Sequence, residues 1–127
     1  MGRWLAFAGV SGLIAIAVGA FGTHVLAGRI PATAASLIAT ATGYQMVHSL
    51  ALLGVAILAR ERAGRSATAE LAGWCFVAGM VLFCGSLYVL ALTGVGPVAW
   101  LTPVGGVALM VGWAALARQG FVLWRES

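Results

Sequence analysis

Long uncharged apolar runs alternate with short polar segments along the chain. The first run extends from Trp4 to Gly28 and contains no Asp, Glu, Lys or Arg. As an α-helix it would be about 37 Å long, enough to cross a hydrocarbon core of about 30 Å. It also exceeds the apolar region of a cleaved signal peptide, which rarely passes about 15 residues. We therefore predict a retained membrane span over 4–28.

The second apolar run follows a short polar turn. Arg29 and the segment "RIPATAAS" make this turn, and Pro31 suits the first turn of a helix. The run continues as far as "RERAGRSATAE", a charged loop over 60–70. We predict the second span over 34–59.

The third apolar run covers 71–117 without a charge and is too long for one crossing of a bilayer. The segment "TGVGP" at 93–97 divides it with two glycines and a proline, which are typical of a turn. The pattern predicts a third span over 71–92 and a fourth over 98–117, followed by a short polar tail.

Composition decides which class of protein these helices build. The 127 residues are 62% hydrophobic and 8% charged, whereas soluble domains average about 25% charged residues. Such a chain cannot cover a water-facing surface with polar groups. We predict an all-α integral membrane protein, a four-transmembrane-helix bundle that forms a single domain over 1–127.

The basic residues indicate how the bundle is oriented. Four crossings place both termini and the middle loop on one side of the membrane. Six of the seven basic residues belong to that side, and Arg29 alone belongs to the other. The positive-inside rule therefore predicts a plasma (inner) membrane protein with both termini cytoplasmic. The net charge of +4 is explained by arginines that interact with anionic head groups of membrane lipid, and not by binding of nucleic acid. The six residues are Arg3, Arg60, Arg62, Arg65, Arg118 and Arg125.

Polar side chains interrupt the second span in "TGYQMVHSLALL" at 42–53. At about 1.5 Å per residue, Gln45 lies at nearly the same depth as Ser86 and Thr102 of the later spans. Lipid offers such groups no partner, so they must face the bundle. The predicted polar packing layer comprises Tyr44, Gln45, His48, Ser49, Ser86 and Thr102.

Glycines lie near the same depth and predict close approach of helix backbones. The predicted close-packing positions are Gly19, Gly22, Gly43, Gly85, Gly105 and Gly106. We further expect Gln45 and His48 to find partners on the third and fourth spans, with Ser86 and Thr102 the nearest candidates. An unpaired amide or imidazole in hydrocarbon would be costly.

The polar residues of the spans give little support for ligand binding or catalysis. His24 and His48 differ in depth by roughly two helical turns, and no acidic residue falls inside a span. We therefore expect no metal, no cofactor and no catalytic residue, and we place His24 at the outer interface. Cys75 and Cys84 point to opposite faces of one helix, so they cannot form a disulfide. A proton relay through His48 and Tyr44 remains an alternative.

Four segments, one in each span, carry a family resemblance. They are "GAFGTHVL", "TGYQMVHSLALLG", "LFCGSLYVLAL" and "TPVGGVALMVGW". Together they resemble the YgdD-like inner-membrane proteins, a small four-helical family of unknown function whose pattern has Ala where this chain has Thr23. The resemblance implies the same fold and a plasma-membrane location. It supplies no catalytic or binding residue.

These observations favour a non-catalytic multi-pass protein that serves as a structural or accessory bundle. Such a bundle could self-associate or form part of a larger membrane complex. The alternative is an oligomeric transporter or channel component for a small solute or protons, which would use the polar layer around His48.

Overall fold

The structure is a computed structural model that describes residues 1–61 and 66–127. Its regular elements in these ranges are helical: α1 (Gly2–His24), α2 (Ala32–Glu61), α3 (Ala67–Thr93), the short 3₁₀ helix η1 (Gly96–Trp100) and α4 (Leu101–Glu126). Four helical segments are long and apolar enough to cross a membrane, the last being η1 and α4 together. The predicted all-α architecture with four potential spans is confirmed.

Local signals explain where α3 begins and ends. The Ser66 side chain accepts a hydrogen bond from the backbone N–H of Ala69, which caps the helix. α3 therefore starts several residues before the predicted boundary at 71. At its other end, Gly94 adopts a left-handed conformation with φ of 68°, which glycine tolerates better than any other residue.

Two other helix ends differ from the sequence prediction. α1 ends at His24 rather than at 28, and Gly28 has a left-handed φ of 73° in the turn that follows. α4 continues to Glu126 rather than ending at 117. The polar tail does not stop this helix, because Arg and Gln are good helix formers even where they leave the hydrocarbon.

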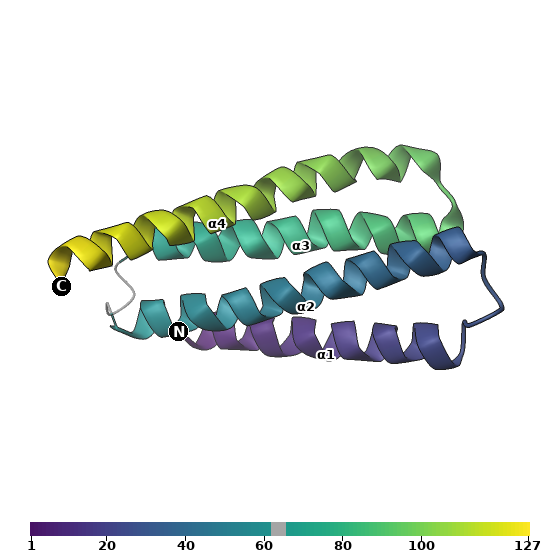
Figure 1. The fold of residues 1–127 in the computed structure, drawn as a ribbon, viewed down its shortest axis with the longest axis horizontal. Coiled ribbons are helices and arrows are strands. Elements are labelled where there is room, and N and C mark those ends of the chain that lie inside the picture. Colours follow the sequence, from purple (N-terminus) through teal and green to yellow (C-terminus); the bar gives the residue numbers. More distant parts are fainter. Residues whose placement is uncertain (62–65) are drawn as a thin grey trace.

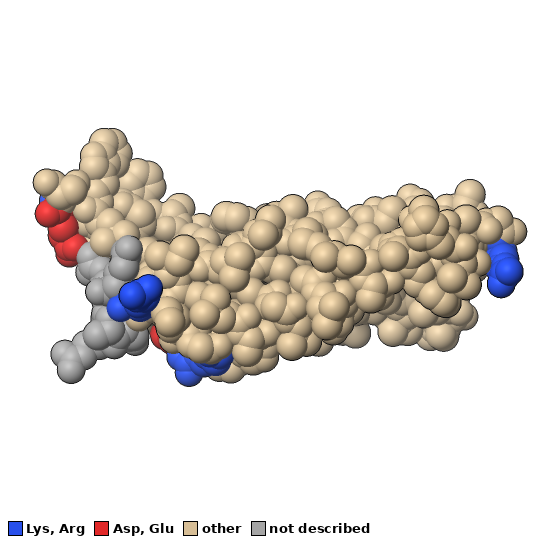
Figure 2. Space-filling view, turned by 90° about the horizontal axis from the view of Figure 1, so that it is seen from below, with Lys and Arg blue, Asp and Glu red and all other residues tan. Residues whose placement is uncertain are grey.

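Consecutive helices are antiparallel neighbours: α1 packs on α2, α2 on α3, and α3 on α4. Both chain termini lie at one end of the bundle, which we call the terminal end (Figure 1). The connections after α1 and α3 lie at the other end, which we call the loop end. The charged side chains visible in Figure 2 lie toward the two ends, with an uncharged surface between them. Arg62 and Arg65 lie outside the described residues.

Aromatic rings meet glycines of a neighbouring helix at two places in the core. The fully buried Trp4 ring of α1 packs on Gly73 of α3, where an added Cβ would lie 2.5 Å from the ring. The buried Phe76 of α3 meets Gly112 of α4 in the same way. Close packing in the core therefore includes contacts between large rings and glycines of a neighbouring helix. Sequence reasoning did not select these glycines.

Candidate functional site

Gln45 is the centre of a hydrogen-bond network that joins three helices. Its side chain is buried, and its Nε2 donates to the Ser11 carbonyl oxygen at 3.1 Å and to Ser11 Oγ at 3.3 Å. Its Oε1 accepts from the Tyr88 hydroxyl at 2.6 Å. Gln45 therefore links α2 to both α1 and α3. The predicted inward orientation is confirmed, and Tyr88 supplies the expected partner on the third span.

Ser49 and Ser11 extend this network along the α1–α2 contact. Ser49 Oγ lies 2.8 Å from Ser11 Oγ and 2.7 Å from the Gln45 carbonyl oxygen. The Ser49 hydroxyl proton can therefore be donated to either of these two oxygens. Ser11 Oγ in turn donates to Met80 Sδ of α3 at 3.4 Å. Each hydroxyl is satisfied inside the bundle, as expected of polar groups that hold helices together in lipid.

His48 forms a second connection, between α2 and α4. The indole N–H of Trp113 donates to His48 Nε2 at 3.0 Å, and His48 Nδ1 lies 2.6 Å from the Tyr44 carbonyl oxygen. An indole N–H can only donate and a carbonyl can only accept. Nε2 is therefore the acceptor and Nδ1 carries the proton, so these contacts require a neutral imidazole in one defined tautomer.

Ser86 and Thr102 form a third, separate pair. Their hydroxyl oxygens lie 2.6 Å apart across the α3–α4 contact, and Ser86 also donates to the Phe83 carbonyl at 2.9 Å. Neither residue has a hydrogen bond to Gln45 or His48. The expectation that they would be the partners of those two residues is wrong, because similar depth does not mean that side chains face one another.

Tyr44 takes part in these networks through its backbone carbonyl and not through its side chain. Its side chain is half-exposed, and its ring lies 4.6 Å from the Phe83 ring and stacks at 6.1 Å on His48. Its hydroxyl has no hydrogen bond within the part of the chain that the structure describes. The structure thus places this residue at the edge of the predicted layer, facing outward.

The six predicted glycines behave differently from one another. A Cβ at Gly105 would overlap the Phe83 backbone, so α3 and α4 approach most closely there. At Gly22 and Gly106 the nearest atoms would lie at ordinary contact distances, 3.5 Å and 3.7 Å. At Gly19, Gly43 and Gly85 an added Cβ would meet no atom within 4 Å. The structure does not support close packing within one chain at these last three positions.

The terminal end carries its own polar contacts. Arg3 pairs with Glu70 and lies over the Trp4 ring at 5.0 Å. Trp4 Nε1 also donates to Glu70 at 3.3 Å. Between α4 and α3, Arg118 donates to the Thr68 hydroxyl at 2.7 Å. These contacts fix α3 against α1 and α4 outside the apolar spans.

No metal centre is found among the described residues: no group of three or more His, Cys, Asp or Glu could hold an ion there. His24 is exposed at the end of α1, and His48 lies in the core. No carboxylate makes a hydrogen bond to His48, whose two ring nitrogens contact Trp113 and Tyr44. The arrangement is suited to helix association, and it offers no orienting carboxylate for acid–base catalysis.

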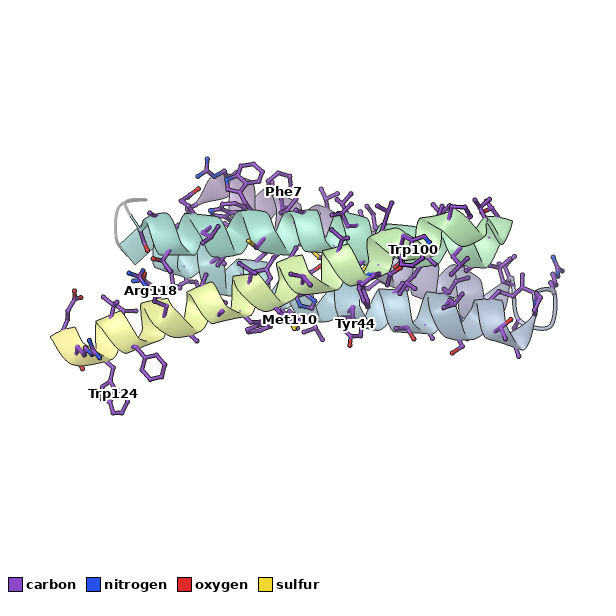
Figure 3. All side chains as sticks on the ribbon, turned by 90° about the horizontal axis from the view of Figure 1, so that it is seen from above. Phe7, Tyr44, Trp100, Met110, Arg118 and Trp124 are labelled. Atoms are coloured by element: carbon purple, nitrogen blue, oxygen red, sulfur yellow. The ribbon has the colours of Figure 1, made fainter. Side chains whose placement is uncertain are left out.

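An apolar groove of about 940 Å³ lies between α2 and α4, with Phe83 of α3 also lining it. We call it the α2–α4 groove. Its wall on α2 runs from Ala39 to His48, and its wall on α4 runs from Thr102 to Trp113. Figure 3 shows Tyr44 and Met110, which line it, near the middle of the bundle.

Comparison with known proteins identifies the relatives of this chain. Residues 18–106 match the model of a family described as "Protein of unknown function (DUF423)". The chain is 43% identical to the UPF0382 inner membrane protein YgdD of Escherichia coli K12, over 97% of this chain and 92% of that protein. It is 38% identical to a UPF0382 membrane protein of Haemophilus influenzae, over 94% of each chain.

A third relative is also similar over most of its length. The chain is 41% identical to the UPF0382 membrane protein YwdK of Bacillus subtilis, over 82% of this chain and 84% of that protein. No solved structure matches the chain. The resemblance seen in the sequence is confirmed, and with it the assignment to the membrane.

Proposed function

Because the chain belongs to the DUF423 family of membrane proteins of unknown function, we propose that it serves as a non-catalytic accessory bundle of the inner membrane. In this proposal the four helices form a rigid unit with both termini in the cytoplasm. The outer apolar surface of the unit associates with further copies of the chain or with a larger membrane complex.

The pairing of the polar groups is the observation that supports this proposal most strongly. The buried side chains of Gln45, His48 and Ser86 all have hydrogen-bond partners inside the chain. The surface between the two ends is apolar, and large side chains such as Leu13 and Val81 are about two-thirds exposed, at 68% and 66%. Polar contacts thus serve the fold, which leaves the apolar surface for lipid and protein partners.

The distribution of arginines supports the proposed orientation. Arg3, Arg60, Arg118 and Arg125 belong to the terminal end, and Arg29 belongs to the loop end. Positive residues near the ends of spans favour the cytoplasmic side. The terminal end is therefore assigned to the cytoplasm in this proposal.

The transporter alternative is supported less well by the geometry around His48. A proton relay needs an imidazole that can exchange protons with water or with a carboxylate. Here Nε2 accepts from the Trp113 indole and Nδ1 faces a backbone carbonyl. These contacts hold the ring in one tautomer and favour a packing role for His48.

Self-association is tested with two differently tagged copies of the full chain, co-expressed and purified in mild detergent. We expect one tag to recover the other, and we expect the mass of the purified complex to exceed the 13.0 kDa of one chain. The matched control mixes separately purified copies, which should exchange slowly. A chain that is monomeric in detergent and in nanodiscs, with no crosslinked membrane partner in cells, would overturn the proposal.

A further inference from the structure

The α2–α4 groove is confined to one half of the bundle. Its residues on α2 and on α4 lie between the loop end and the middle of each helix. The hydrogen bond between His48 and Trp113 joins the two helices at the groove's inner end, at 3.0 Å. From Thr102 to Trp113 the groove is about 16 Å long, roughly half of a hydrocarbon core of about 30 Å. An occupant therefore enters from the leaflet at the loop end.

Two hydroxyl groups on the α2 wall of the groove lack partners. Thr40 and Tyr44 are one helical turn apart and both line the groove. Neither hydroxyl has a hydrogen bond among the described residues. Acyl chains carry no hydrogen-bond acceptor, and an unsatisfied hydroxyl in hydrocarbon is costly. These donors call for an occupant that carries an acceptor.

Two glycines enlarge the groove without serving the packing of the chain itself. A Cβ at Gly43 would meet no atom within 4 Å, and one at Gly106 would meet only the Phe83 ring, at 3.7 Å. Glycine in the middle of a helix destabilises it relative to alanine. The space at Gly43 has no use inside one chain, but it does widen the groove for an occupant.

We propose that the α2–α4 groove binds one acyl chain of an ester phospholipid from the leaflet at the loop end. The ester carbonyl accepts hydrogen bonds from Thr40 and Tyr44, and the acyl chain lies along the apolar wall toward Trp113. Such a groove has the size and the apolar lining, with a few polar groups, that are typical of small-molecule sites. This site goes beyond the proposed accessory role and does not depend on self-association.

A helix from a second copy fits the groove less well. A spanning helix would have to pass the His48–Trp113 contact, which closes the groove near the middle of the bundle. A single acyl chain does not meet this obstacle, because it ends within one leaflet.

Native mass spectrometry of the full chain tests the proposal, with dioleoyl phosphatidylethanolamine and its diether analogue as probes. The diether keeps the chains and the head group but lacks the ester carbonyls. We expect one diester lipid per chain and about 25-fold weaker binding of the diether, as the loss of two hydrogen bonds of about 1 kcal/mol each implies. Equal binding of the two lipids, or no retained lipid, would overturn the proposal.

Three variants place this lipid in the groove. Gly43→Leu fills the groove and should weaken lipid binding at least about tenfold, whereas Gly54→Leu is the control. Gly54 is on the same helix, does not line the groove and also has no atom within 4 Å of an added Cβ. Tyr44→Phe removes only the hydroxyl and should reduce the difference between the diester and the diether.

Other outcomes of the variant series would contradict the proposal. If Gly43→Leu binds the diester as the parent does, the lipid lies elsewhere. If Gly43→Leu dissociates a dimer while the parent retains no lipid, the groove belongs to a second copy. Should Gly43→Leu fail to fold, as judged by its helical circular dichroism, Gly106→Leu replaces it. The comparison of diester with diether needs no variant at all.

Discussion

The Trp113 indole N–H donates a hydrogen bond to His48 Nε2 across the α2–α4 contact, at 3.0 Å. This contact holds the imidazole in its neutral form with the proton on Nδ1, because the indole can only donate. It also closes the α2–α4 groove at the middle of the bundle. One pair of residues thus bears on both the stability of the fold and the shape of the candidate lipid site.

Trp113→Phe should lower the stability of the bundle, because it removes the donor and leaves Nε2 of a buried imidazole unpaired. The expected loss is about 0.6–2 kcal/mol, the usual range for interhelical hydrogen bonds in membranes. It can be measured as unfolding in mixed detergent, followed by circular dichroism. Trp124→Phe is the control, since Trp124 is 74% exposed near the end of the same helix. Equal stabilities of the two variants would mean that the His48–Trp113 contact contributes nothing.

Gln45→Leu should destabilise the chain more than Tyr88→Phe does. The first change leaves the Tyr88 hydroxyl without its acceptor and removes the two hydrogen bonds from Gln45 to Ser11, and we expect a loss of about 1–3 kcal/mol. The double variant should lose less than the sum of the two, because the pair is removed together. The same unfolding assay gives all three values. Additive losses would show that Gln45 and Tyr88 do not interact.

Gly105→Ala should be destabilising by about 1–3 kcal/mol through overpacking, because its Cβ would overlap the Phe83 backbone. Gly85→Ala is the matched control in the partner helix α3, where the added Cβ meets no atom within 4 Å. There we expect no loss, or a gain of up to about 1 kcal/mol from helix propensity. Thermal unfolding in one detergent compares the two. A Gly105→Ala variant as stable as the control would contradict the close approach of α3 and α4.

The orientation of the bundle can be tested in cells. Reporter fusions after residue 127 and within the turn at 93–97 should report opposite sides of the membrane, with the C-terminal fusion in the cytoplasm. The physical reason is the excess of arginine at the terminal end. A periplasmic C-terminus would contradict the proposed topology.

The four helices could be predicted from the sequence because each is a long uncharged run bounded by charges, glycine or proline. The inward orientation of Gln45 and His48 could be predicted as well, since hydrocarbon offers these side chains no partner. Ser49 and Ser86 are buried for the same reason.

The identity of the partners could not be predicted, because depth along a helix does not say which side of it a residue faces. Ser11 was missed as a partner of Gln45: counted from the predicted span ends, it lies about 10 Å from the depth of Gln45. Trp113 and Tyr88 were missed because their rings reach across helix contacts. Each of these aromatic residues carries a polar atom inside an uncharged run, and that atom was the available signal of a hydrogen bond between helices. Gly105 was selected from the sequence and does pack closely, whereas the close packing of Gly73 and Gly112 is recognised only from the rings opposite them.

The central claim, that the polar layer holds the helices together and carries no protons, is tested most directly at His48. Solid-state nitrogen NMR of imidazole-labelled protein in lipid bilayers at neutral pH distinguishes the two neutral tautomers and the imidazolium. Trp113→Phe assigns the signal, since it removes the only indole that contacts Nε2 among the described residues. The account predicts a single neutral imidazole for His48 with the proton on Nδ1 and Nε2 as acceptor. An imidazolium, or a ring that exchanges between tautomers through water, would contradict it and favour a proton pathway.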